Sequence, residues 1–127
     1  MSAASSRATL VMVTAASEEQ AVSIARALVG ERLAACANIV GPIRSIYRWQ
    51  GEVHDDSEHL MLIKTRASLV SKIESRVRQL HSYEVPEVIA VSIAGGAKPY
   101  LEWLLDSTSS APVSRARKGR RTTSSNG

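Results

Sequence analysis

Residues 33–66 have the sequence LAACANIVGPIRSIYRWQGEVHDDSEHLMLIKTR, which carries the clearest structural pattern in the chain. Two strand-forming segments flank a tight turn at residues 50–52. β-Branched and aromatic side chains, among them Tyr47 and Trp49, precede the turn, and the apolar run 60–63 follows it. The stretch therefore predicts a long β-hairpin. An unbroken apolar run also favours a strand that is covered on both faces.

The length of this hairpin predicts that it extends beyond its own domain. Each arm has roughly fourteen residues and spans about 45 Å, whereas a body of about 100 residues is roughly 34 Å across. Tyr47 and Trp49 lie near the far end. An isolated two-stranded ribbon is barely stable in water, so we expect another subunit to cover them. The alternative is a ribbon that bends at a bulge predicted at Gly41-Pro42 and packs on its own body.

Apolar spacing predicts the elements on either side of the hairpin. Buried strands are expected at 9–14 and 88–93, and helices at 17–33, 68–80 and about 99–106. The first helix begins with a capping box, because Ser17 is followed three residues later by Gln20.

The order of these elements predicts an α+β fold. Two right-handed crossovers joined through a central hairpin form a ferredoxin-like βαββαβ sandwich, a four-stranded antiparallel sheet with both long helices on one face and here an extra C-terminal helix. The other face is apolar as well, so we expect a partner subunit to cover it.

Composition agrees with a single small domain. The chain has 127 residues and is 44% hydrophobic, which suits one core and one domain at residues 8–107. Five of its basic residues and none of its acidic ones lie in residues 108–127, so the net charge of +4 less these five leaves −1 for the rest. We expect this basic tail to be disordered and the folded domain to bind no nucleic acid.

The sequence contains no apolar stretch that would span a membrane and no secretion signal, so we expect a cytoplasmic protein. Its one cysteine cannot form an internal disulfide, which agrees with a reducing compartment. The paired cysteines of heavy-metal domains, the stacking aromatics of RNA-recognition motifs, phosphate-binding loops and nucleophile elbows are missing from their usual places. The sequence therefore excludes these classes of protein.

A set of polar residues would converge in the predicted fold: Cys36, Glu58, Lys64, His81, Tyr83 and Glu87. Cys36 is either a small buried side chain or a thiolate ligand. His81 either ends a helix, where a cation is favourable, or is a ligand. Glu87 enters an apolar strand and needs a partner, for which Lys64 is a candidate.

Several segments together resemble the CutA divalent-cation tolerance proteins. They read LAACANI at 33–39, YRWQG at 47–51, LIKT at 62–65, HSYEVPE at 81–87 and YLEWL at 100–104. The resemblance covers roughly residues 9–107. It implies a stable cytoplasmic homotrimer of ferredoxin-like subunits, similar in architecture to PII signalling proteins, without a catalytic reaction and linked to tolerance of copper and other divalent metals.

The resemblance and the ligand chemistry together give two main functional hypotheses, and an uncharacterised hydrolase is a third. In the first, Cys36, His81 and Glu87 bind copper or another divalent metal that folding does not require. In the second, a PII-like sensor binds a small anion in an inter-subunit cleft that includes Glu58, Lys64 and Tyr83. The expected trimer interface includes Tyr47, Trp49 and Trp103. Val13, Leu80 and Ser82 depart from the pattern of some bacterial members, which have a cysteine, a histidine and a proline there.

Overall fold

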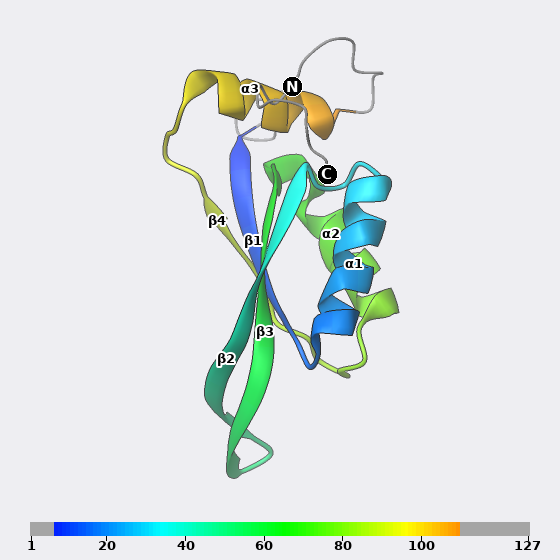
Figure 1. The fold of residues 1–127 in the computed structure, drawn as a ribbon, viewed down its shortest axis with the longest axis vertical. Coiled ribbons are helices and arrows are strands. Elements are labelled where there is room, and N and C mark those ends of the chain that lie inside the picture. Colours follow the sequence, from blue (N-terminus) through cyan, green and yellow to red (C-terminus); the bar gives the residue numbers. More distant parts are fainter. Residues whose placement is uncertain (1–6, 110–127) are drawn as a thin grey trace.

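The computed structural model describes residues 7–109 (Figure 1). Its elements follow the predicted order: β1 (Ala8–Ala15), α1 (Glu18–Gly30), β2 (Cys36–Trp49), β3 (Glu52–Arg66), the short 3₁₀ turn η1 (Ala67–Leu69), α2 (Val70–Leu80), β4 (Val88–Ser92) and α3 (Lys98–Ser107). The predicted α+β class with a four-stranded antiparallel sheet and three helices is confirmed. Our prediction for the basic tail falls almost entirely on residues 110–127, outside the described part of the chain.

The sheet has the order β2-β3-β1-β4, and its neighbouring strands are antiparallel. Helices α1 and α2 lie together over one face, and α3 lies across one end (Figure 1). Alternate residues of β1 and β3, such as Val11, Met61 and Ile63, are fully buried beneath these helices with Ile24 and Ile73. Removing this apolar area from water supplies the main stabilisation of the fold.

The hairpin of β2 and β3 runs beyond the ends of the helices and of the other strands, as its length predicts (Figure 1). Trp49 pairs with Glu52 across a two-residue turn. Gln50 and Gly51 both have positive φ, 52° and 83°, which the tightest hairpin turns require. The register shifts between Val40 and Ile43, where the bulge was predicted.

Helix α1 is shorter than predicted. The Ser17 side chain accepts a 3.1 Å hydrogen bond from the backbone N–H of Gln20, so the predicted N-terminal cap is confirmed. The helix ends at Gly30 rather than at Leu33, because Arg32 adopts a left-handed conformation with φ of 64° and the N–H of Leu33 bonds back to the Leu28 carbonyl. This turn directs the chain into β2, and such a turn is a common way to end a helix.

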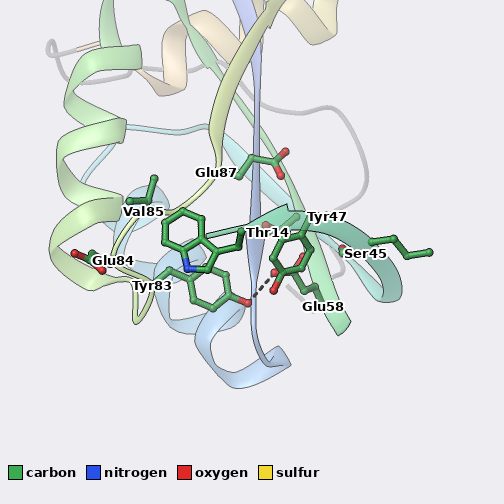
Figure 2. Close-up of a pocket in the computed structure, with 10 residues that line it drawn as sticks. Thr14, Ser45, Tyr47, Glu58, Tyr83, Glu84, Val85 and Glu87 are labelled. Atoms are coloured by element: carbon green, nitrogen blue, oxygen red, sulfur yellow. Dashed lines mark hydrogen bonds between the residues drawn. The ribbon is translucent and has the colours of Figure 1, made fainter. Parts of the chain in front are cut away.

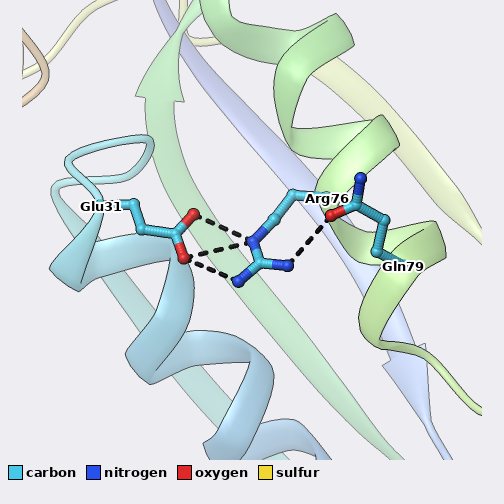
Figure 3. A network of polar contacts seen from close by, with 3 residues as sticks. All are labelled: Glu31, Arg76 and Gln79. Atoms are coloured by element: carbon cyan, nitrogen blue, oxygen red, sulfur yellow. Dashed lines mark hydrogen bonds and ion pairs between the residues drawn. The ribbon is translucent and has the colours of Figure 1, made fainter.

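An exposed ion pair joins the two long helices (Figure 3). Arg76 on α2 donates to both carboxylate oxygens of Glu31 just after α1, with Nη2 at 2.8 Å from Oε2, and to the Gln79 side chain at 3.0 Å. The pKa of Glu31 is lowered chiefly by its hydrogen bond to Arg76.

The packed body continues two residues beyond Ser107, where we had placed its end. Thr108 is buried, and its hydroxyl accepts a 3.1 Å hydrogen bond from Arg66. Arg32 donates to the carbonyl of Ser109 at 2.7 Å. The residue types did not predict this, because Thr108 and Ser109 are small and polar like the residues of the tail that follows them.

The sheet face opposite the helices is open in the single subunit. Ile89 and Val91 are about half exposed there, opposite the half-buried Met12 and Leu10 in the β1–β4 register. Further exposed apolar side chains lie on β2, β3 and the loop before β4: Val40, Ile46, Tyr47, Trp49, Val53 and Val85. So many exposed apolar side chains on one subunit mark an interaction surface.

Candidate functional site

His81 caps the end of α2 and uses both ring nitrogens within the subunit. Its Nε2 lies 2.7 Å from the carbonyl oxygen of Thr14 at the end of β1, and its Nδ1 accepts a 3.0 Å hydrogen bond from the backbone N–H of Tyr83. This pattern requires a neutral ring that carries its proton on Nε2. His81 therefore joins the loop after α2 to the sheet, and binding a metal would break one of these bonds.

Cys36 lies at the other end of the sheet, on its open face. Its Sγ is 3.7 Å from Oδ1 of Asn38 and 4.0 Å from Nζ of Lys64. Lys64 also bonds to Asn38, and within residues 7–109 it forms no ion pair with Glu87, the partner we had suggested. Glu87 itself is exposed. The pKa of Tyr100, a residue of α3, is raised chiefly by burial and to a lesser extent by the nearby Cys36 side chain.

The strand register separates the proposed metal ligands. Cys36 is opposite Lys64, which is opposite Leu10, whereas His81 contacts Thr14. Four residues along β1 correspond to about 13 Å. Within residues 7–109 no three His, Cys, Asp or Glu side chains come close enough to hold one metal ion. A metal site that includes both Cys36 and His81 would need ligands from more than one subunit.

Glu58 and Tyr83, by contrast, are brought together. The Tyr83 hydroxyl donates a 2.7 Å hydrogen bond to Oε2 of Glu58, whose residue is only 6% exposed (Figure 2). Lys64 is six residues further along β3, about 20 Å away in an extended strand. Of the three residues that we expected to share a cleft, the structure therefore unites two and places Lys64 with Cys36.

A pocket of about 570 Å³ opens beside the Tyr83–Glu58 pair (Figure 2). Such a volume is typical of small-molecule sites. The pocket lies between the hairpin, the end of β1 and the loop before β4, and is lined by Thr14, Ser45, Ile46, Tyr47, Trp49, Glu58, Tyr83, Glu84, Val85 and Glu87. The sequence placed Tyr47 and Trp49 at an interface and missed Thr14, Glu84 and Val85. Glu84 and Val85 lie in the segment 81–87 quoted above, but their position beside the hairpin, like that of Thr14, follows only from the fold.

The pocket has a negative electrostatic environment. Burial and then the hydrogen bond to Glu58 raise the pKa of Tyr83 well above its usual range. The Tyr47 hydroxyl donates a 2.5 Å bond to Asp56, and this bond is the main cause that raises the pKa of Tyr47. Neither phenol loses its proton readily, since nearby carboxylates disfavour a further negative charge.

The remaining predicted residue, Trp103, lies on α3 at the opposite end of the subunit from the hairpin turn. Its ring packs against Tyr100 with centroids 5.3 Å apart. Trp103 is half-buried, so it contributes to the packing of α3 within the subunit. Its expected role at a trimer interface stays a prediction.

Comparison with known proteins gives consistent matches. Residues 9–107 match the family model described as CutA1 divalent ion tolerance protein. Over 99 residues the chain is 54% identical to a divalent-cation tolerance protein CutA of Thermus thermophilus, which covers 78% of this chain and 96% of that one. Over the same length it is 50% identical to a chloroplastic protein CutA of Arabidopsis thaliana, of which it spans 54%.

A solved structure agrees with these matches. The crystal structure of CutA1 from Oryza sativa superposes with a TM-score of 0.79 at 45% identity, covering 83% of this chain and 96% of that one. In the described part of this chain no helix is both long and apolar enough to cross a membrane.

Proposed function

As the chain belongs to the CutA1 divalent ion tolerance protein family, we propose that it acts in tolerance to divalent metal ions as a cytoplasmic homotrimer that binds metal and catalyses no reaction. The match over residues 9–107 is the observation that carries this proposal. The sheet order β2-β3-β1-β4 supports the ferredoxin-like assignment within it.

Two features support assembly. The sheet face opposite the helices exposes Val40, Ile89 and Val91, and the hairpin extends beyond the body with Tyr47 and Trp49 each 41% exposed. A face of this kind is stabilised when other subunits cover it. Assembly also bears on the metal site, because Cys36 and His81 are too far apart within one subunit to bind the same ion.

We propose that copper is the preferred metal of a site that subunits share. Thiolate and imidazole are soft to intermediate ligands that favour copper over magnesium, which requires several oxygen ligands. Cys36 is a free, half-buried thiol on the open face of the sheet, where a second subunit could reach it. His81 would need to exchange one of its two internal hydrogen bonds for the metal.

Calorimetric titration of Cu²⁺ and Mg²⁺ into the wild type, Cys36→Ser and His81→Gln tests this proposal. We expect the wild type to prefer copper and each variant to bind it at least about tenfold more weakly. Glu102→Gln, at an exposed position on α3, is the control and should bind as the wild type does. Melting curves recorded beside each titration separate a lost ligand from a lost fold. Equal copper affinity in folded samples of all four proteins would refute the site.

The pocket beside Tyr83 gives little support to the alternative of a PII-like anion sensor. Its lining includes three carboxylates and, among the ten residues drawn in Figure 2 and given above, no lysine or arginine. Anions bind where positive charge or free N–H groups collect. We therefore do not propose an anionic ligand for this pocket.

A further inference from the structure

We propose that the metal ion at the shared site binds to Nδ1 of His81, and that it reaches this atom only when the loop at residues 81–87 releases the backbone N–H of Tyr83. This inference rests on the proposed function, since it names the ligand atom of that site and the movement that controls it. The contacts that carry it all lie within one subunit, so they do not depend on what covers the open face of the sheet.

The first argument is the position of the proton on the His81 ring. The Thr14 carbonyl can only accept a hydrogen bond, so Nε2, at 2.7 Å, carries the proton, and Nδ1 keeps the lone pair that a metal requires. A histidine that binds a metal commonly donates the N–H of its other ring nitrogen to a backbone carbonyl, which fixes the direction of the ring. The bond from Nε2 to Thr14 already has this form. Thr14 is therefore the positioning residue, and Nδ1 is the atom that remains for the metal.

The second argument is the group that occupies Nδ1 in the free subunit. Its lone pair accepts a 3.0 Å hydrogen bond from the backbone N–H of Tyr83, and the His81 residue is only 8% exposed. The bond to Tyr83 is partly buried, whereas the bond to Thr14 is buried, so the ring opens more readily on the Nδ1 side. One lone pair cannot serve both the amide and a metal. Metal binding therefore competes with closure of the loop.

The third argument is a further hydrogen bond that holds the loop closed. The hydroxyl of Ser82 donates at 3.1 Å to the side-chain carbonyl oxygen of Gln20 on α1. Ser82 lies between His81 and Tyr83 in the chain, so this bond stabilises the closed loop without using either ring nitrogen. When only a fraction of the molecules has the conformation that binds, the apparent affinity is reduced by that fraction. The closed loop therefore lowers the metal affinity of the site.

Nitrogen NMR of the intact protein with labelled histidine rings identifies the ligand atom, with His81→Gln to assign the signals. We expect Cu(I), added without oxygen and kept reduced by ascorbate, to shift the Nδ1 resonance of His81 while Nε2 keeps its proton. The backbone N–H of Tyr83 should exchange with solvent at least about tenfold faster in the copper-saturated protein, because it has lost its acceptor. Copper that binds through Nε2, or that leaves this exchange rate unchanged, would overturn the inference and leave the proposed function standing. Calorimetry that finds no copper binding would refute both.

Two variants test the coupling between the loop and the metal. Ser82→Ala and Gln20→Ala remove the same exposed hydrogen bond from its two ends, and neither residue is a proposed ligand. We expect both to bind copper about two- to threefold more tightly than the wild type, since less free energy opposes opening of the loop. Glu102→Gln is again the control and should bind as the wild type does. Unchanged or weaker copper binding in folded samples of both loop variants would contradict the coupling.

Discussion

The hydroxyl of Tyr83 donates a 2.7 Å hydrogen bond to Oε2 of Glu58 and so joins the loop before β4 to the hairpin. The two residues are 25 positions apart in the chain. Glu58 is almost fully buried, so the presence of this hydrogen bond affects the stability of the fold as well as the shape of the pocket.

Tyr83→Phe should therefore destabilise the protein. It leaves a buried carboxylate without its donor, which costs about 1–3 kcal/mol. The matched control is Tyr47→Phe, which removes a phenol–carboxylate bond to Asp56 at a more exposed position and should cost less. Urea unfolding followed by circular dichroism at one protein concentration compares the two variants. If Tyr47→Phe lost as much free energy of unfolding as Tyr83→Phe, burial would not explain the destabilisation.

Replacement of Trp49 should weaken assembly. Trp49 lies at the hairpin end and is 41% exposed in the single subunit, and truncating a buried aromatic anchor costs more than about 2 kcal/mol of association free energy. Sedimentation equilibrium at micromolar concentration should find a trimeric wild type and partial dissociation of Trp49→Ala. Val29→Ala on α1 is the control, since Val29 is similarly exposed but lies away from the hairpin. A monomeric wild type would contradict the trimer itself.

Two glycines of similar exposure should respond in opposite ways to alanine. A Cβ at Gly41 would overlap the ring of His59, so Gly41→Ala should destabilise by about 1–3 kcal/mol through overpacking. A Cβ at Gly30 meets no atom within 4 Å at the end of α1, so Gly30→Ala should stabilise by about 0.5–1 kcal/mol. Chemical denaturation of both variants measures the difference. Equal effects would mean that the hairpin bulge moves to accommodate the methyl group.

The Glu31–Arg76 pair should contribute stability that depends on pH. Its hydrogen bond holds the folded-state pKa of Glu31 below the ordinary value near 4.5. A lowered carboxylate pKa adds stability that is fully present above the unfolded-state pKa and is lost as the pH falls through the folded-state value. Arg76→Gln should therefore melt slightly below the wild type at pH 7, and the difference should shrink as the pH falls below about 4.5. Since the pair is exposed, 1 M salt should reduce the difference at pH 7, and a difference that persists at acidic pH would assign the effect to packing.

The elements and their order follow from the pattern of residue types along the chain. Apolar periodicity placed α2 and β4 within about two residues, and Ser17 with Gln20 placed the start of α1. Gly51 and the bulge near Gly41 were also readable. These features depend on interactions between residues close in the chain, which a local pattern of residue types records.

The contacts that make up the candidate sites, by contrast, depend on the folded chain. The bond between the His81 ring and the Thr14 carbonyl joins residues 67 positions apart in the chain. It shows that the ring has a structural partner within the subunit, whereas the sequence allowed His81 to be either the end of a helix or a ligand. Strand register placed Lys64 beside Cys36 and far from Glu58, although all three had been expected to converge. Sequence patterns state which side chains face the sheet, but the distance between two of them depends on how strands from distant parts of the chain are aligned, and that alignment is a property of the whole fold.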